Sequence, residues 1–238
     1  MKLPFLPSVA ALCGLLAVAG CSQQDQGTAA APAASAQADA GARQLDTYRQ
    51  LLRIHNDAMA VTMGHDILDH YPDSAAAKEV QQTLPDIEKR WKLDSEKSRL
   101  AALWLYQVSP MEGGTQSTAT IYSSQPAGND RVRLVLRRHT AWGQNAFLFG
   151  SGHGFVCRGN CTLPATFDGT SHGIKAFAPS TGEPALMIRD DKRFIARLQK
   201  AKKITIDVTL VDGEKKQTLV YEVGGFDPAK WQGLPKKK

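Results

Sequence analysis

The sequence predicts an α+β fold, in which an N-terminal helical hairpin is followed by an antiparallel β-sandwich-like domain with one inserted helix. Two observations predict this class. Apolar residues recur every three or four positions before residue 100 and every second position after it. The second part also contains short Val-, Ile-, Thr- and Phe-rich segments separated by turn residues. The 238 residues, 42% of them apolar and 22% charged, exclude collagen-like, wholly disordered and polytopic membrane proteins.

Residues 1–20 are predicted to be a signal peptide. After Met1-Lys2, an apolar run extends to Gly20, which suits a secretory signal and is too short to span a bilayer. The segment Val18-Ala19-Gly20-Cys21 resembles a bacterial lipobox. This resemblance implies that Cys21 becomes the lipidated N-terminus, and the alternative is an incidental cysteine after an ordinary cleavage site.

The lipoprotein resemblance also implies a location. Ser22, in place of an acidic residue, does not signal retention in the inner membrane, so we expect a lipid anchor on the periplasmic face of the outer membrane. Several acyl chains would hold the protein there, at about 0.8 kcal/mol per buried methylene. Residues 21–42 are rich in Ala, Gln, Ser and Gly, and we expect them to form the lipidated cysteine and a disordered linker.

Residues 43–99 are predicted to be helical. One apolar stripe extends to Tyr71, and Pro72 should end that first helix because it disfavours the α conformation of the residue before it. Asp73 or Ser74 can cap a second helix, with Glu79 closing a capping box.

The junction HYPDSAAAKEVQQTLPDI resembles the turn of a tetratricopeptide-type helical hairpin, which residues 43–93 would then form. Pro85 fits the first turn of a further helical segment. There is no second copy at a fixed period, so an extended repeat array is not expected.

Residues 100–228 are predicted to be the β-rich domain. An inserted helix should begin at Asp190-Asp191 and carry Phe194, Ile195 and Leu198 on its apolar face. The strand candidates are 103–106, 118–122, 131–138, 146–149, 153–157, 161–167, 174–178, 185–188, 204–210 and 218–223.

Two of the four cysteines remain for the folded part, because Cys13 lies in the signal peptide and Cys21 would carry lipid. An oxidising periplasm would join Cys157 and Cys161 in a disulfide. The alternative is a zinc site, for which these two cysteines and the nearby histidines 153 and 172 offer ligands of suitable chemistry. We predict the disulfide and no metal site.

We predict no catalytic residues, no cofactor and therefore no enzyme. On the first helix, His65-Asp66-x-x-Asp69-His70 forms His/Asp pairs four residues apart but lacks a general-base glutamate. The segment Gly150-Ser151-Gly152-His153-Gly154 places a serine near a histidine, but no helix follows to form a nucleophile elbow.

Basic residues recur along the β-rich part and in the basic tail, 229–238. We predict a contact loop at Trp142 with Arg137 and Arg138, since an exposed loop tryptophan often marks a binding surface. The expected partner, besides the membrane holding the lipid, is an envelope protein or an anionic envelope component. Nucleic acid is not expected, because no aromatic residues interleave with the basic ones.

Four short motifs carry a family resemblance: Phe167-Asp168, Ile188-Arg189-Asp190, Ala201-Lys202-Lys203, and Tyr221 to Phe226. With the cysteine pair, they resemble uncharacterised proteobacterial envelope proteins and, more distantly, the β-sandwich lipoproteins associated with type VI secretion. The resemblance implies a structural role for these motifs and transfers no catalytic role.

The sequence thus favours a non-enzymatic lipoprotein that binds or helps to assemble envelope components. One alternative is an inhibitor or immunity-type lipoprotein that blocks a periplasmic enzyme with a loop such as 139–144. The other is a metal-dependent or cell-wall hydrolase that uses His65, His70, His153 or His172.

Overall fold

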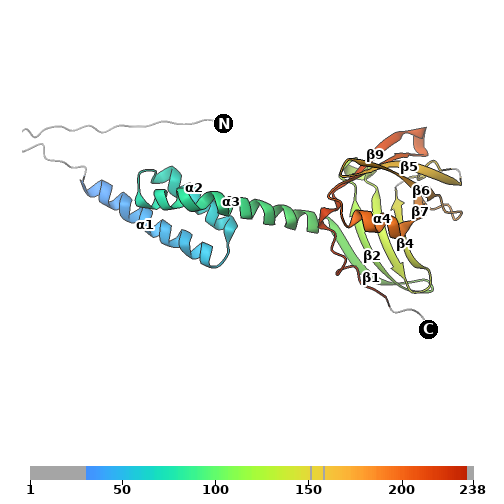
Figure 1. The fold of residues 1–238 in the computed structure, drawn as a ribbon, viewed down its shortest axis with the longest axis horizontal. Coiled ribbons are helices and arrows are strands. Elements are labelled where there is room, and N and C mark those ends of the chain that lie inside the picture. Colours follow the sequence, from blue (N-terminus) through green and yellow to red (C-terminus); the bar gives the residue numbers. More distant parts are fainter. Residues whose placement is uncertain (1–30, 151, 158, 235–238) are drawn as a thin grey trace, which may run out of the picture.

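The computed structural model describes residues 31–234 except 151 and 158, so the predicted signal peptide and Cys21 lie outside the described residues. Three helices come first and a nine-stranded antiparallel sheet with a fourth helix follows within this part of the chain (Figure 1). The predicted α+β class and the order of its two parts are therefore confirmed.

The helical part contains three helices where the sequence predicted a hairpin. They are α1 (Ala31–Arg53), α2 (Asp57–His70) and α3 (Ala75–Ala102). The prediction of a single helix extending to Pro72 was wrong, because the chain turns between α1 and α2. There His55 adopts a positive φ of 55°, and the N–H of Asn56 donates to the carbonyl of Leu51 at 2.9 Å. This is the geometry of a Schellman helix end, with histidine in the place glycine usually takes.

The linker prediction also needs correction, because α1 begins at Ala31 and residues 31–42 are helical. Alanine has the highest helix propensity of all residues, and the segment is rich in it. The end of this segment also has a tertiary contact. Gly41 is buried, and a side chain there would meet the Tyr71 ring, with its Cβ 3.3 Å from Cγ.

The turn between α2 and α3 lies at the predicted place. The Ser74 hydroxyl caps α3 by accepting the N–H of Ala77 at 3.0 Å. Glu79 does not close a capping box; its carboxylate accepts instead from Arg49 of α1, at 2.8 Å from Nε. Pro85 lies inside α3 and does not open a new segment, because buried neighbours on both sides hold the helix in place.

Close packing joins the three helices. Gly64 of α2 lies so near α3 that an added Cβ would come 2.8 Å from a methyl carbon of Leu84. The hydroxyls of Tyr48 in α1 and Thr83 in α3 share a hydrogen bond of 2.9 Å beside the fully buried Ile67. The helices thus have a core of their own, separate from that of the sheet.

The sheet has the strand order β1-β2-β3-β4-β7-β6-β5-β8-β9, and all neighbours are antiparallel. The candidate strand 153–157 is not one, since Phe155 forms only an isolated bridge to Leu210 between glycines of positive φ. The strands are β1 (Trp104–Met111), β2 (Gly114–Tyr122), β3 (Arg133–His139), β4 (Gly143–Phe149), β5 (Asn160–Phe167), β6 (Thr170–Phe177), β7 (Ala185–Ile188), β8 (Ile204–Thr209) and β9 (Lys216–Tyr221).

The sheet curls around one core, so the sandwich-like interior lies between two halves of a single sheet (Figure 1). One edge strand, β9, approaches the end of β2. The chain just after β2 bonds to β9, where Ser124 N–H donates to the Val220 carbonyl at 2.7 Å and Val220 N–H donates to Gln125 at 3.0 Å.

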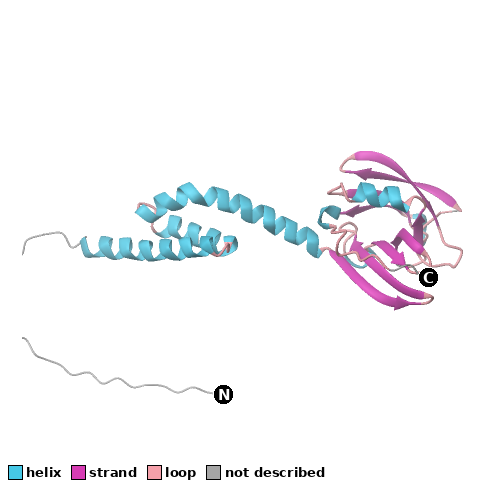
Figure 2. Ribbon diagram, turned by 60° about the horizontal axis from the view of Figure 1, so that its bottom comes forward, coloured by secondary structure: helices cyan, strands magenta, loops and turns pink. Residues whose placement is uncertain are grey.

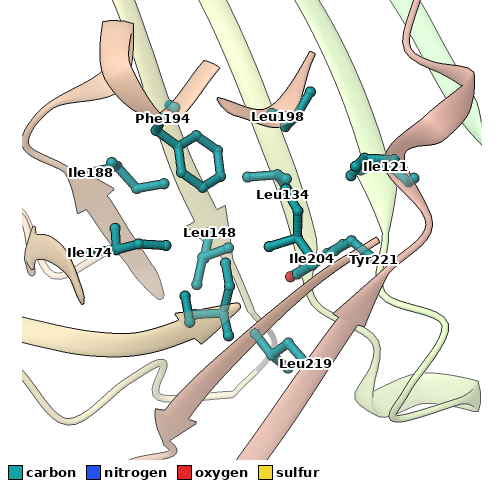
Figure 3. Close-up of a cluster of buried hydrophobic side chains, with 14 of the residues drawn as sticks. Ile121, Leu134, Leu148, Ile174, Ile188, Phe194, Leu198, Ile204, Leu219 and Tyr221 are labelled. Atoms are coloured by element: carbon teal, nitrogen blue, oxygen red, sulfur yellow. The ribbon is translucent and has the colours of Figure 1, made fainter. Parts of the chain in front are cut away.

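The predicted inserted helix is α4 (Asp191–Leu198), capped by the Asp190 carboxylate, which accepts from Arg193 N–H at 3.1 Å. Its buried face enters the core of the sheet. Phe194 and Leu198 lie among side chains from both halves, including Leu134 of β3 and Ile204 of β8 (Figure 3).

The motifs of the family resemblance have structural roles here. The Asp168 carboxylate accepts the backbone N–H groups of Lys202 and Lys203 at 2.8–3.1 Å, which fixes the chain between α4 and β8. Gly225 touches the last turn of α3, where its Cβ would lie 2.2 Å from the Leu100 carbonyl carbon. The Gly225 contact brings the β-domain against the end of α3. Figure 2 shows the long helix ending beside the sheet.

The predicted basic tail, 229–238, begins too early. Trp231 is fully buried in the β-domain core, and its indole N–H donates to the Ser117 carbonyl at 3.1 Å. The segment around it is therefore structural, and residues 235–238 lie outside the described residues. None of the helices between residues 31 and 234 combines the length and apolar character needed to cross a membrane.

Candidate binding groove on the sheet

The outer face of the sheet carries a groove of about 590 Å³ over β1, β2, β3, β4, β6 and β7. Side chains along β3 point alternately to the two faces of the sheet, which determines which of them reach the groove. Leu134 and Leu136 point into the core, so Arg133, Val135 and Arg137 face outward. The volume falls within the range of small-ligand and peptide pockets.

The floor of the groove is one row of side chains across six strands. The register places Thr120 beside Val135, Val135 beside Phe147, and Phe147 beside Met187. Leu105 of β1 and Phe177 of β6 extend the row at its two ends. The floor is therefore apolar except for one hydroxyl group.

An arginine lies on each side of this row. In one flanking row, Arg137 lies between Thr118 and Asn145, and in the other, Arg133 lies between Tyr122 and Phe149. Because both arginines belong to β3 and are four residues apart, their side chains leave the same face of the sheet.

Both guanidinium groups lie over aromatic rings. The guanidinium carbon of Arg133 lies 4.6 Å from the ring centre of Phe149, and that of Arg137 lies 5.1 Å from Phe147 and 5.2 Å from Trp142. Stacking uses the faces of the guanidinium and leaves its N–H edges for planar acceptors. One edge of Arg137 donates to the Asn145 side-chain oxygen at 2.8–3.0 Å.

The groove carries more positive than negative charge. Among the described residues that line it, Glu183 is the one carboxylate. Among the described residues, neither Arg133 nor Arg137 has an ion pair within 4 Å. Burial lowers the pKa of Arg137, an effect that the Glu183 charge partly opposes. An anion that reached Arg137 would therefore restore electrostatic stabilisation lost through desolvation.

The structure separates the three residues of the predicted contact loop. Trp142 is half exposed and stacks on His139, with ring centres 3.9 Å apart, next to Arg137 and the groove. Arg138 points to the opposite face, because neighbouring strand residues alternate. There its guanidinium lies 3.8 Å from the Trp231 ring and donates to that residue's carbonyl at 2.6 Å. Arg138 therefore does not belong to a contact surface with Trp142.

The cysteine pair matches the predicted disulfide, with 2.13 Å between the sulfur atoms of Cys157 and Cys161. Sulfur atoms joined in this way are not thiolate ligands for zinc. The two histidines of the alternative zinc site are engaged elsewhere. His153 lies 2.5 Å from Asp212 and lowers the pKa of that carboxyl group, and His172 lies edge-on to Phe167.

The two histidines of the first predicted helix, His65 and His70, do not converge on a common site either. His65 contacts Glu88 of α3 at 2.8 Å, and His70 bonds through its ring to the carbonyl oxygen of Asp66. Ser151 lies outside the described residues. Within residues 31–234 apart from the two gaps, no three His, Cys, Asp or Glu side chains are arranged to hold a metal ion.

Some of the predicted basic surface gathers around a second, smaller hollow of about 360 Å³ beside α4. Its basic lining residues are Lys175, Arg189, Arg193 and Arg197. Arg193 pairs with Asp190 at 3.0 Å, and Arg189 donates to Asn160 at 2.6–3.0 Å. These contacts already engage two of its four cations.

Sequence reasoning found Arg137 and Trp142 but missed that Arg133, Phe147 and Phe149 belong to the same site. The available signal was the alternation of Arg133, Val135 and Arg137, which places both arginines on one strand face. The order of the strands, which brings β7 and β6 beside β4, was not readable from any local pattern. Comparisons of the chain with protein-family models, curated proteins and solved structures found no match to any of them.

Proposed function

We propose that the protein is a lipid-anchored, non-enzymatic binding module of the bacterial outer membrane, which uses the β-domain groove to hold an acidic segment of an envelope protein. The observation that carries the proposal is the pair of stacked arginines, Arg133 and Arg137, on either side of an apolar floor. Carboxylates pair with guanidinium edges in planar geometry. Apolar residues beside the acidic ones in the partner segment would cover the groove floor.

The rest of the chain supports such a role. The lipobox-like segment ending at Cys21 would supply the anchor. The helices would then act as a spacer, since α3 has 28 residues and a helix of that length measures about 42 Å. Figure 1 shows α1 and α2 extending away from the β-domain, and no residue of the four described helices lines the groove.

Site-specific photo-crosslinking in the producing cells tests the proposal. A photoreactive residue replaces Thr118, which pairs with Arg137 in the groove, and as a control replaces Gln217 of β9, which does not line the groove. We expect a protein adduct from position 118 and none from position 217. Mass spectrometry should map the adduct to a partner segment that contains Asp or Glu.

The same adduct should disappear in the double variant Arg133→Gln/Arg137→Gln and persist in Lys215→Gln, which removes a positive charge from a residue that does not line the groove. An adduct that forms equally well in the double arginine variant would overturn the proposal, as would crosslinking to lipid alone. If the partner is a single periplasmic enzyme that the protein blocks, the inhibitor alternative replaces a role in assembly while the groove assignment stands.

A further inference from the structure

We infer that the groove selects an extended peptide with two acidic residues four positions apart and an apolar residue midway between them. The inference rests on the proposed function and adds to it the spacing and backbone form of the ligand. Its basis is the way in which β3 displays Arg133, Val135 and Arg137 in succession on one face.

The spacing follows from strand geometry. Four residues along a strand at about 3.3 Å each place the Cα atoms of Arg133 and Arg137 roughly 13 Å apart. A peptide that lies parallel to β3, and so crosses the floor row at Val135, has the same rise in extended form. Its residues i, i+2 and i+4 then point to the same side and repeat the spacing of the two arginines.

The middle position follows from the groove floor. Val135 lies between the arginines, with Phe147 beside it on β4 and Thr120 beside it on β2. These three side chains line the groove. The partly exposed Phe147 offers most of the apolar surface, because only 7% of Val135 is exposed. A polar residue at position i+2 would lose its water there without finding an adequate partner, whereas an apolar residue would gain about 25 cal/mol per Å² of buried surface.

A helical ligand does not fit this arrangement. In a helix, residues four apart are separated by only about 6 Å along the axis, less than half the spacing of the arginines. The two acids of a helical peptide could therefore engage one arginine but not both. Movement of the guanidinium groups to compensate would give up their aromatic contacts and the bonds of Arg137 to Asn145.

Three peptides test the inference against the full lipidated chain in nanodiscs of neutral phosphatidylcholine. The first is acetyl-Glu-Ser-Leu-Ser-Glu-amide, the second replaces both Glu residues with Gln, and the third has the same composition in the order Glu-Glu-Leu-Ser-Ser. Isothermal titration calorimetry or NMR titration gives the dissociation constants. We expect the first peptide to bind at least tenfold more tightly than each of the others.

The outcomes separate the two proposals. Equal binding of the first and third peptides, with weaker binding of the Gln peptide, would overturn the spacing and leave the acidic-ligand function intact. Equal binding of the first two peptides, or no saturable binding by any at millimolar concentration, would overturn both. Lys215→Gln, which removes one positive charge outside the groove lining, serves as the control and should leave all three affinities unchanged.

A charge exchange gives a second test that does not depend on one variant. Arg137→Glu should weaken binding of the first peptide at least tenfold. A peptide with Lys in place of one terminal Glu should recover the binding. Recovery should occur with Lys at the end of the peptide that lies opposite position 137, so the two singly substituted peptides also report the direction of the bound chain. Recovery at neither end, in a variant whose thermal unfolding matches the parent protein, would contradict the inference.

Discussion

Gly225 lies where the β-domain meets the end of α3, and there is no room for a side chain. A Cβ atom at this position would lie 2.2 Å from the carbonyl carbon of Leu100 and 2.4 Å from the backbone nitrogen of Ala101. Nearby, Arg99 pairs with Glu222 at 2.7 Å and with Glu96 at the same distance. Single residues thus decide how the helical part joins the sheet.

We predict that Gly225→Ala destabilises the protein by about 1–3 kcal/mol, the usual cost of forcing an added carbon into a tightly packed site. The contacts are with backbone atoms, which cannot move aside as a flexible side chain can. Thermal unfolding measured by circular dichroism would show the loss. Gly233→Ala is the control, because no atom lies within 4 Å of the added Cβ. Equal stability of the two variants would contradict this account of the junction.

Trp231 decides in the same way how the C-terminal segment is placed. It is fully buried, contacts Phe226 and lies under the Arg138 guanidinium. We predict that Trp231→Ala costs about 3–5 kcal/mol, as removal of a buried aromatic side chain generally does. Urea unfolding would measure the loss, and the exposed Trp142→Ala provides the comparison. A change below 1 kcal/mol at Trp231 would show that the segment is not part of the core.

At the scale of elements, the break between α1 and α2 determines the shape of the helical part. The sequence presents a continuous apolar stripe across it, so the positive φ of His55 was not expected. Asn56 then caps α2 by accepting the N–H of Met59 at 3.2 Å, and Asp57 stands in the first turn. The pair Asn56-Asp57 was the available sequence signal, because both residues favour helix starts.

Asp57 also joins α2 to α3, since its carboxylate accepts from Arg90 at 2.5 and 2.6 Å. These bonds lower the pKa of Asp57 in the folded protein. The stabilisation is therefore complete above the unfolded-state pKa of about 4 and is lost as the pH falls through the lower folded-state pKa.

We predict that Asp57→Asn is less stable than the parent protein at pH 7 and that the difference shrinks as the pH falls below about 4. Urea unfolding of both proteins at a series of pH values, followed by helix content, would measure it. Asp69→Asn is the control, because Asp69 has no ion pair among those the structure describes. A difference that stays constant down to pH 2 would contradict the role of the Asp57 charge.

At the scale of the whole molecule, a curled sheet presents the groove and a helical part separates it from the chain's N-terminal side. The proposed anchor belongs to this scale, because it would determine which surface of the cell the groove faces. Its support is the lipobox-like segment before Cys21 together with Ser22.

We predict that Cys21→Ala abolishes incorporation of labelled palmitate, since the acyl chains require the cysteine sulfur and its new amino group. Ser22→Asp should keep the label but move the protein to inner-membrane fractions, because an acidic residue there would signal retention. Metabolic labelling and density-gradient fractionation measure both. Label that persists without Cys21 would refute the lipoprotein assignment.

The sequence by itself determined the change from helical to strand period near residue 100, the inserted helix α4 and the cysteine pair. The first two depend on local periodicity, and the cysteine pair follows because only two cysteines remained for the folded part. Only the tertiary structure decided that Arg138 turns to Trp231 while Arg137 faces the groove, and that Phe147 and Phe177 share one floor. The reason is physical, because strand alternation and the helical repeat depend only on neighbouring residues. Which strands pair, and which side chains pack against a given face, depend on residues distant in the chain.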